Sequence, residues 1–127
     1  MNLKADGATM RFVRFDYDGS NLEIAAENAF GSGHPTLHPN GRNILTDASL
    51  GENGETQHGK VPLRWIDLQN RTEAVLAWVD ARPTNDRLAA LRVDPDPAWD
   101  REYRTFVFNA CPQGRRRVFV CDVENLL

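Results

Sequence analysis

An internal repeat limits the folds open to this chain more than any other feature of its sequence. The segment HPTLHPNGRNILTDAS, residues 34–49, aligns with DPAWDREYRTFVFNAC, residues 96–111. Several polar, proline and alanine positions coincide in this alignment: His34 with Asp96, Pro35 with Pro97, Arg42 with Arg104, Asp47 with Asn109 and Ala48 with Ala110. A repeat of this kind predicts similar supersecondary units that stack against one another.

An aspartate also recurs three times within a short apolar pattern. The segments FVRFDYDG, LRWIDLQN and VFVCDVEN carry Asp16, Asp67 and Asp122 at the same position, each beside apolar residues. Aspartate at the end of a strand most often accepts hydrogen bonds from the backbone of the following turn. We therefore expect these three residues to stabilise turns and to take no part in chemistry.

The segments between the turns have the composition of short β-strands. They are rich in β-branched and aromatic residues, whereas Pro, Asn and Gly gather between them. In the middle repeat the pattern predicts strands near 34–38, 43–48, 62–68 and 73–79. Four antiparallel strands in a unit of roughly 50 residues are typical of a β-propeller blade. The expected fold class is all-β, an incomplete β-propeller of about two four-stranded blades and roughly nine strands.

The 127 residues are expected to form a single partial-propeller domain. Residues 10–27 would form a half blade, residues 34–79 a complete blade, and residues 95–123 a blade that lacks its outer strand. A closed ring typically needs about 4–8 blades, so these strands are not expected to close one within a single chain. A helical pattern occurs only at 84–91, where we expect at most one helical turn.

Charge and hydropathy exclude several classes of partner. The net charge is −3 and the isoelectric point is near 5.6, which argues against binding to nucleic acid or to an anionic membrane. No apolar run approaches the roughly 18 residues of a spanning helix, and MNLKADGATM lacks a signal-peptide core. A cytoplasmic location is therefore expected. Cys111 and Cys121 would lie too far apart along a hairpin for a disulfide, so both thiols should be free.

Two stretches resemble the repeat of TolB-like propellers: HPNGRNILTDA and DPAWDREYRTFVFNACPQGRRRVFVCDVENLL. The stretch GSGHPTLHPNGRNILTDA, followed by LRVDPDPAWD, is similar to the oligogalacturonate lyase-like branch of that superfamily. The resemblance covers most of the chain from Met10 onward. It implies a divalent metal such as Mn²⁺, held by histidine and glutamine ligands at the propeller mouth, and a basic residue that acts on an acidic sugar.

Loops that follow the second and fourth strands of successive blades share one face, the mouth at which propeller ligands usually bind. The innermost strands, which begin at His34 and Asp96, open onto the same face. His34, His58 and Asp94 are the candidate metal ligands, and His58 and Arg92 are the candidate catalytic residues. The whole candidate ligand site comprises His34, Gln57, His58, Arg92, Asp94 and Asp96.

Each candidate also has a structural interpretation. His34 and His38 flank a strand of five residues, about 16 Å long, so they lie at opposite faces and cannot share a metal. His34 would then bond the neighbouring loop, His38 would begin the turn HPNG, and His58 would be solvated. The arginines 115–117 span a hairpin turn and are expected to be separated by alternation. Three tryptophans fall in strand patterns and are expected in the core between blades: Trp65, Trp78 and Trp99.

Two functions from different classes follow from these observations. The first is a non-catalytic binding or self-assembly module whose partner is another copy of the same chain, because unpaired strand edges favour association. The alternative is a metal-assisted lyase that acts on acidic oligosaccharides, with a pocket completed only in an assembly. A remnant of a longer propeller without a function of its own is a third interpretation.

Overall fold

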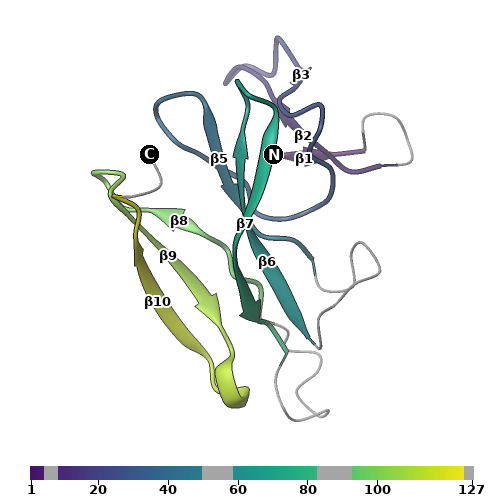
Figure 1. Ribbon diagram of the computed structural model, residues 1–127. Helices are drawn as coiled ribbons and strands as arrows, with labels where there is room; N and C mark the ends of the chain where they lie inside the picture. Colours follow the sequence, from purple (N-terminus) through teal and green to yellow (C-terminus); the bar gives the residue numbers. More distant parts are fainter. Residues whose placement is uncertain (5–8, 50–58, 83–92, 125–127) are drawn as a thin grey trace.

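Three small antiparallel sheets follow one another along the chain (Figure 1). The computed structural model describes residues 1–4, 9–49, 59–82 and 93–124. Within these ranges the chain forms ten β-strands and a single 3-10 turn. The all-β, incomplete propeller fold predicted from the repeat is therefore confirmed. The predicted helical turn at 84–91 lies outside the described residues.

The middle sheet contains the complete four-stranded blade. Its strands are β4 (Thr36–Leu37), β5 (Asn43–Thr46), β6 (Lys60–Asp67) and β7 (Thr72–Asp80), and they are hydrogen-bonded in the order β4-β5-β6-β7. All pairs are antiparallel, as in an up-and-down meander. The four predicted strands are all present, in the predicted order.

The last sheet has three strands in the order β10-β9-β8. These are β8 (Ala98–Trp99), β9 (Thr105–Ala110) and β10 (Arg117–Asp122), and the 3-10 turn Pro112–Gly114 joins the last two. Strand β10 therefore forms an edge of this sheet. No fourth strand is paired with it in the part of the chain that the structure describes.

The first sheet has one strand more than the sequence pattern indicates. The two expected strands, β2 (Arg11–Arg14) and β3 (Glu23–Ile24), are joined by β1 (Asn2–Leu3), which pairs with β2 on its other side. β1 lies before residue 10, outside the repeats that predict the other short strands, and its two residues show too little alternation to indicate a strand by themselves. This strand accounts for the difference between the nine strands expected and the ten observed.

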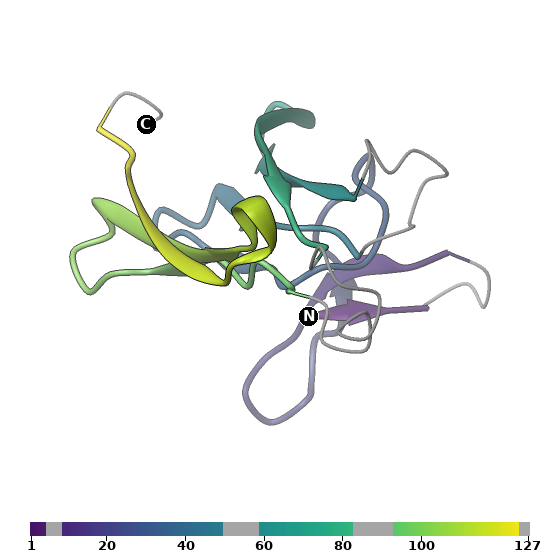
Figure 2. The same cartoon turned by 90° about the horizontal axis from the view of Figure 1, so that it is seen from below.

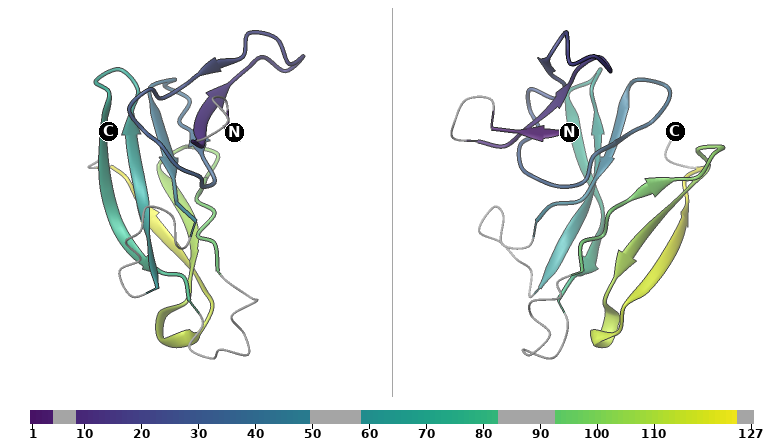
Figure 3. Two further views of the ribbon diagram at one scale, coloured as in Figure 1. Left: turned by 90° about the vertical axis from the view of Figure 1, so that its right-hand side faces the viewer. Right: turned by 180° about the vertical axis from the view of Figure 1, so that it is seen from behind.

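Two hydrophobic cores lie on the two faces of the middle sheet. Successive residues of a strand point to opposite faces, so Ile44 and Leu45 of β5 enter different cores. Leu45 packs with Phe106 of the last sheet, and Ile44 packs with Phe12 of the first. The middle sheet consequently lies between the other two, as Figures 2 and 3 show.

Aromatic side chains fill much of the core between the middle and last sheets. Trp99 contacts Trp65, Phe106 and His38 with ring centroids 6.0, 5.7 and 5.2 Å away. His38 is buried and its Nδ1 accepts the backbone N–H of Asn40 at 3.3 Å, so it is a structural residue of the turn, as expected. The prediction that all three tryptophans are core residues is wrong for Trp78, which lies on the outer strand β7 and is 39% exposed.

One charged side chain is buried between the first and middle sheets. Arg64 of β6 donates from Nε and Nη2 to the two carboxylate oxygens of Glu73, at 2.7 and 2.9 Å, and from Nη2 to the carbonyl oxygen of Phe30 at 2.8 Å. Its guanidinium also lies 5.6 Å from the ring centroid of Phe12. A buried cation needs such partners to offset the loss of hydration.

The recurring aspartates stabilise turns. Asp67 Oδ1 accepts the backbone N–H groups of Gln69 and Asn70, both at 2.9 Å, and Arg42 donates to the same carboxylate. The hydrogen bond from Arg42, helped by these backbone donors, lowers the pKa of Asp67 to about 2. Asp122 similarly accepts the backbone N–H of Glu124 at 2.9 Å. The structural role expected for Asp67 and Asp122 is thereby confirmed, whereas the side chain of Asp16 accepts the side-chain amide of Asn21 at 2.6 Å.

Both cysteines are free thiols, as expected. Cys111 is buried and Cys121 is partly exposed. In the described part of the chain, no helix has the length and apolar character needed to cross a membrane.

The core assignment predicts the outcome of two leucine truncations. Leu45→Ala removes a fully buried side chain and should lower the free energy of unfolding by about 2–5 kcal/mol, because it leaves a cavity between two sheets. Leu37→Ala is the matched control: Leu37 is 50% exposed, and its truncation should change stability by less than about 1 kcal/mol. Urea unfolding followed by tryptophan fluorescence measures both. Equal effects would contradict the assignment.

Candidate functional site

Three polar side chains from two different sheets meet at one end of the structure. His34 precedes β4, Asp47 follows β5, and Asp96 precedes β8. Antiparallel pairing places the start of β4 beside the end of β5, and the packing of the two sheets brings the start of β8 to the same place. One nitrogen or oxygen atom from each side chain lies within 4.8 Å of the other two.

The carboxylate of Asp47 is the centre of this group. It is almost completely buried, and each of its oxygens accepts a backbone N–H: Oδ1 from His34 at 2.6 Å and Oδ2 from Asp96 at 3.1 Å. A single side chain therefore fixes the entry to the innermost strands of both sheets. These charge-assisted hydrogen bonds also offset the cost of burying the carboxylate.

Asp47 is absent from the set of candidates drawn from the sequence. The signal that could have found it is the repeat alignment, which places it opposite Asn109. In the structure Asn109 performs a related task, because its backbone N–H donates to the carbonyl oxygen of Pro95 at 2.7 Å and its side-chain amide to that of Asp94 at 3.4 Å. In both sheets, a residue at the end of the second strand therefore forms hydrogen bonds with the segment that leads into the first strand.

His34 lies between two carboxylates and is about half exposed. Its Nδ1 is 3.1 Å from either oxygen of Asp47 and 3.0 Å from Oδ1 of Asp96. Partial burial alone would lower the pKa of His34. The hydrogen bond with Asp47 and the negative charges of Asp47, Asp96 and Asp94 outweigh burial and raise the pKa above its usual 6.5.

A glycine allows the two strand ends to approach this closely. Gly33 has a φ of +139°, and a Cβ there would overlap the backbone carbonyl oxygen of Asp47 and the hydroxyl of Thr46. The carbonyl oxygen of Gly33 also accepts a hydrogen bond from the side-chain amide of Asn2 in β1. The glycine that precedes His34 is therefore required by geometry at this position.

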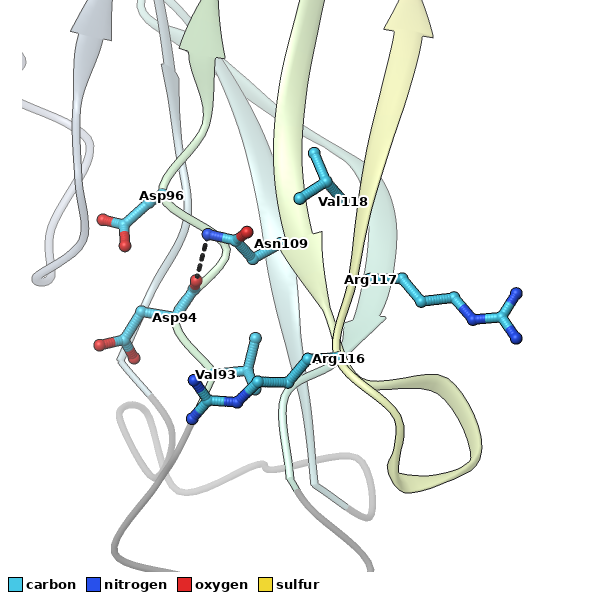
Figure 4. Close-up of a pocket in the computed structure, with 7 residues that line it drawn as sticks. All are labelled: Val93, Asp94, Asp96, Asn109, Arg116, Arg117 and Val118. Atoms are coloured by element: carbon cyan, nitrogen blue, oxygen red, sulfur yellow. Dashed lines mark hydrogen bonds between the residues drawn. The ribbon is translucent and has the colours of Figure 1, made fainter.

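A pocket of about 380 Å³ opens beside this group (Figure 4). Figure 4 shows the carboxylates of Asp94 and Asp96 on one side of the pocket, with Arg116 extending toward Val93 and Arg117 turned away. Alternation along the strand thus separates neighbouring arginines, as expected. Arg116 nevertheless lines the pocket, which its expected place in a hairpin turn does not anticipate.

The structure places half of the sequence-predicted set. His34, Asp94 and Asp96 lie at the same end of the sheets, where His34 contacts Asp96 and the two aspartates line the pocket. Three other candidates lie outside the described residues: Gln57, His58 and Arg92.

The donor set can be compared with the divalent metal that the sequence resemblance implies. An imidazole nitrogen and carboxylate oxygens are suitable ligands for Mn²⁺, and those of His34, Asp47 and Asp96 are close enough together to share an ion. Each oxygen of Asp47 already accepts a backbone N–H but keeps a second lone pair. The residues fit such an ion by donor chemistry, with Asp96 in the place of a second histidine.

The role of Asp47 predicts a large effect of its removal. Asp47→Ala leaves two partly buried backbone N–H groups without their charged acceptor and should lower the free energy of unfolding by about 2–4 kcal/mol. Asp96→Asn is the control, because it removes only an exposed carboxylate and asparagine tolerates the φ of +45° at this position. Its effect should stay below about 1 kcal/mol. Thermal and urea unfolding at pH 7 measure both variants, and a stable Asp47→Ala variant would contradict the bridging role.

Comparison with known proteins supports the fold. No protein-family model and no curated protein matches the chain. Among solved structures, the chain is similar to TolB from Acinetobacter baumannii, with a TM-score of 0.58 and 16% sequence identity. The match covers 94% of this chain but only 28% of the TolB chain. At this level of identity the likeness shows the fold alone: the chain has a TolB-like fold.

Proposed function

We propose that the chain acts as a self-assembly module in which the last sheet binds another copy of the same chain. The observation that carries this proposal is the edge of β10. In the middle sheet the third strand, β6, pairs with β7, whereas its counterpart β10 pairs only with β9 among the described residues. A strand edge of this kind offers a row of backbone donors and acceptors to another strand.

The side chains of β10 support the same proposal. Val118 and Val120 are 67% and 70% exposed. Val107 of β9 lies directly opposite Val120 and is also exposed, so the three valines form an apolar stripe on one face of the last sheet. Exposed apolar residues next to an open strand edge favour association with a second chain.

The outer edge of the middle sheet is protected in ways that β10 is not. The pairing of β6 with β7 shifts register between Leu63 and Arg64, which indicates a bulge. Bulges discourage edge-to-edge pairing, whereas charged residues occur at the ends of both strands and do not distinguish the two edges. The pairing of β10 with β9 runs through six consecutive residues without a shift. Of the two edges, β10 is therefore the better site for a second copy.

The proposal predicts a mass in solution above that of one chain, 14.3 kDa. Light scattering on a size-exclusion column should give a multiple of this mass at micromolar concentrations. Val120→Lys should shift the species to the monomer, because a lysine would place a charge on the paired edge. Val75→Lys, at an exposed valine of β7, is the matched control and should leave the mass unchanged. A wild-type protein that remains at 14.3 kDa at high concentration would exclude self-assembly.

The alternative is a metal-assisted lyase that acts on acidic oligosaccharides at the mouth. Its support is the proximity of His34 and Asp96 to a pocket that Arg116 also lines. Arg116 could pair with a uronate carboxylate. The carboxylates of Asp94 and Asp96 line the same pocket, so a divalent cation held by His34, Asp47 and Asp96 would offset their repulsion of an anionic sugar.

Metal binding and activity can be tested separately. If the group holds an ion, Mn²⁺ should raise the melting temperature of the wild-type protein, because a ligand that binds only the folded state stabilises it. His34→Gln should abolish this shift. Incubation with Mn²⁺ and oligogalacturonate, followed by ultraviolet absorbance of the unsaturated product, tests the lyase. Absence of product at high protein concentration would remove the lyase, and absence of a thermal shift would remove the metal.

A further inference from the structure

We infer that two copies pair through β10 in antiparallel orientation, around a two-fold axis that lies midway between their two Phe119 residues. This inference rests on the proposed self-assembly and specifies its geometry. In such a dimer the partner's β10 takes the position beside β10 that β7 takes beside β6 in the middle sheet. The two three-stranded sheets would then form one continuous sheet across the axis.

The backbone of β10 determines which residues can form the new hydrogen bonds. The N–H of Val123 donates to the carbonyl oxygen of Arg104 at 3.0 Å, toward the β9 side. Residues of an antiparallel strand direct their backbone groups alternately to the two sides. The backbone N–H and carbonyl groups of Phe119 and Cys121 therefore also point toward β9. Those of Val118 and Val120 point toward the open edge.

Symmetry then restricts the register. A two-fold axis that relates neighbouring antiparallel strands is perpendicular to the sheet, so every side chain stays on its own face in both copies. Only residues of the same face can then lie opposite each other, so one residue of β10 must lie opposite its own copy, with the axis between the two. With the axis at Phe119, Val118 lies opposite the partner's Val120. If the pairing extends one residue before β10, Arg116 lies opposite the partner's Asp122.

Chemical complementarity selects Phe119 over its neighbours. The axis at Phe119 pairs apolar with apolar and positive with negative side chains, and each pair occurs twice by symmetry. An axis at Val120 would place Arg116 opposite the partner's Glu124 but would set Asp122 against the partner's Val118. An axis at Val118 would set Arg116 against the partner's Val120. Among these registers, only the first satisfies both kinds of contact on the open face.

The opposite face of the strand also accommodates this register. Phe119 stacks on Phe108 with ring centroids 5.4 Å apart and planes 16° apart. A shallow pocket of about 190 Å³ lies beside these rings and is bordered by Trp78 of β7. The two Phe119 side chains would meet on this face, where the exposed part of Trp78 offers further apolar surface.

Single cysteines distinguish the registers. In a Cys121→Ser background, Phe119→Cys should form a disulfide-linked dimer under mild oxidation, because residue 119 faces itself with Cα atoms about 4.5 Å apart in a non-hydrogen-bonded pair. Val120→Cys should remain largely unlinked, since its copy in the partner would be diagonal to it. The reverse result would overturn this register but leave the self-assembly intact. A wild-type protein that is monomeric by light scattering would instead refute the self-assembly itself.

Charge reversal provides an independent test that needs no new cysteine. Arg116→Asp should weaken the dimer about three- to tenfold, because it sets two aspartates opposite each other at both ends of the interface. Arg116→Asp combined with Asp122→Arg should restore part of the affinity. Arg115→Asp is the matched control. It reverses the same charge one residue away, but residue 115 lies opposite the partner's Val123 and not opposite an acidic residue. Equal weakening by the two single reversals would overturn the register.

Discussion

The arrangement of the middle and last sheets depends on the hydrogen bonds that the buried carboxylate of Asp47 accepts. Leu45 and Phe106 pack between these sheets, but apolar contact has no preferred direction and does not by itself define how the strands start. Hydrogen bonds are directional. By accepting the backbone N–H groups of His34 and Asp96, Asp47 fixes the starts of both innermost strands relative to each other. The positions of His34 and Asp96 at the mouth follow from this constraint.

The same carboxylate also determines the electrostatics of the mouth. A buried negative charge needs positive charge or donors nearby, and His34 supplies both an N–H of its backbone and a ring that binds a proton more readily than usual. Asp94 and Asp96 add further negative charge beside the pocket, where Arg116 is the nearby lining cation that Figure 4 shows extending toward this side. In the lyase alternative, an acidic sugar would meet these carboxylates, and a cation bound beforehand would offset their repulsion.

Much of the fold, but only part of the site, could be predicted from the sequence. The repeat and the recurring aspartate were sufficient for the strand order, because turns and alternation are local properties. Asp47 could not be singled out, because its role depends on which loop of the next sheet reaches it. The short strand β1 and the exposure of Trp78 likewise depend on tertiary packing. The roles of Gln57, His58 and Arg92 stay predictions, since these residues lie outside the described ranges.

Strand β10 leaves two features exposed: the unpaired backbone groups of its edge and the apolar side chains on one of its faces. A neighbouring strand satisfies the N–H and carbonyl groups of the edge, whereas only a second layer can cover the stripe formed by Val107, Val118 and Val120. Pairing around Phe119 satisfies the backbone edge and brings the two stripes, six valines in all, together on one surface. That surface is larger than either stripe alone. A dimer built in this way would therefore offer a wider apolar face to any further blade-like surface than the single chain does.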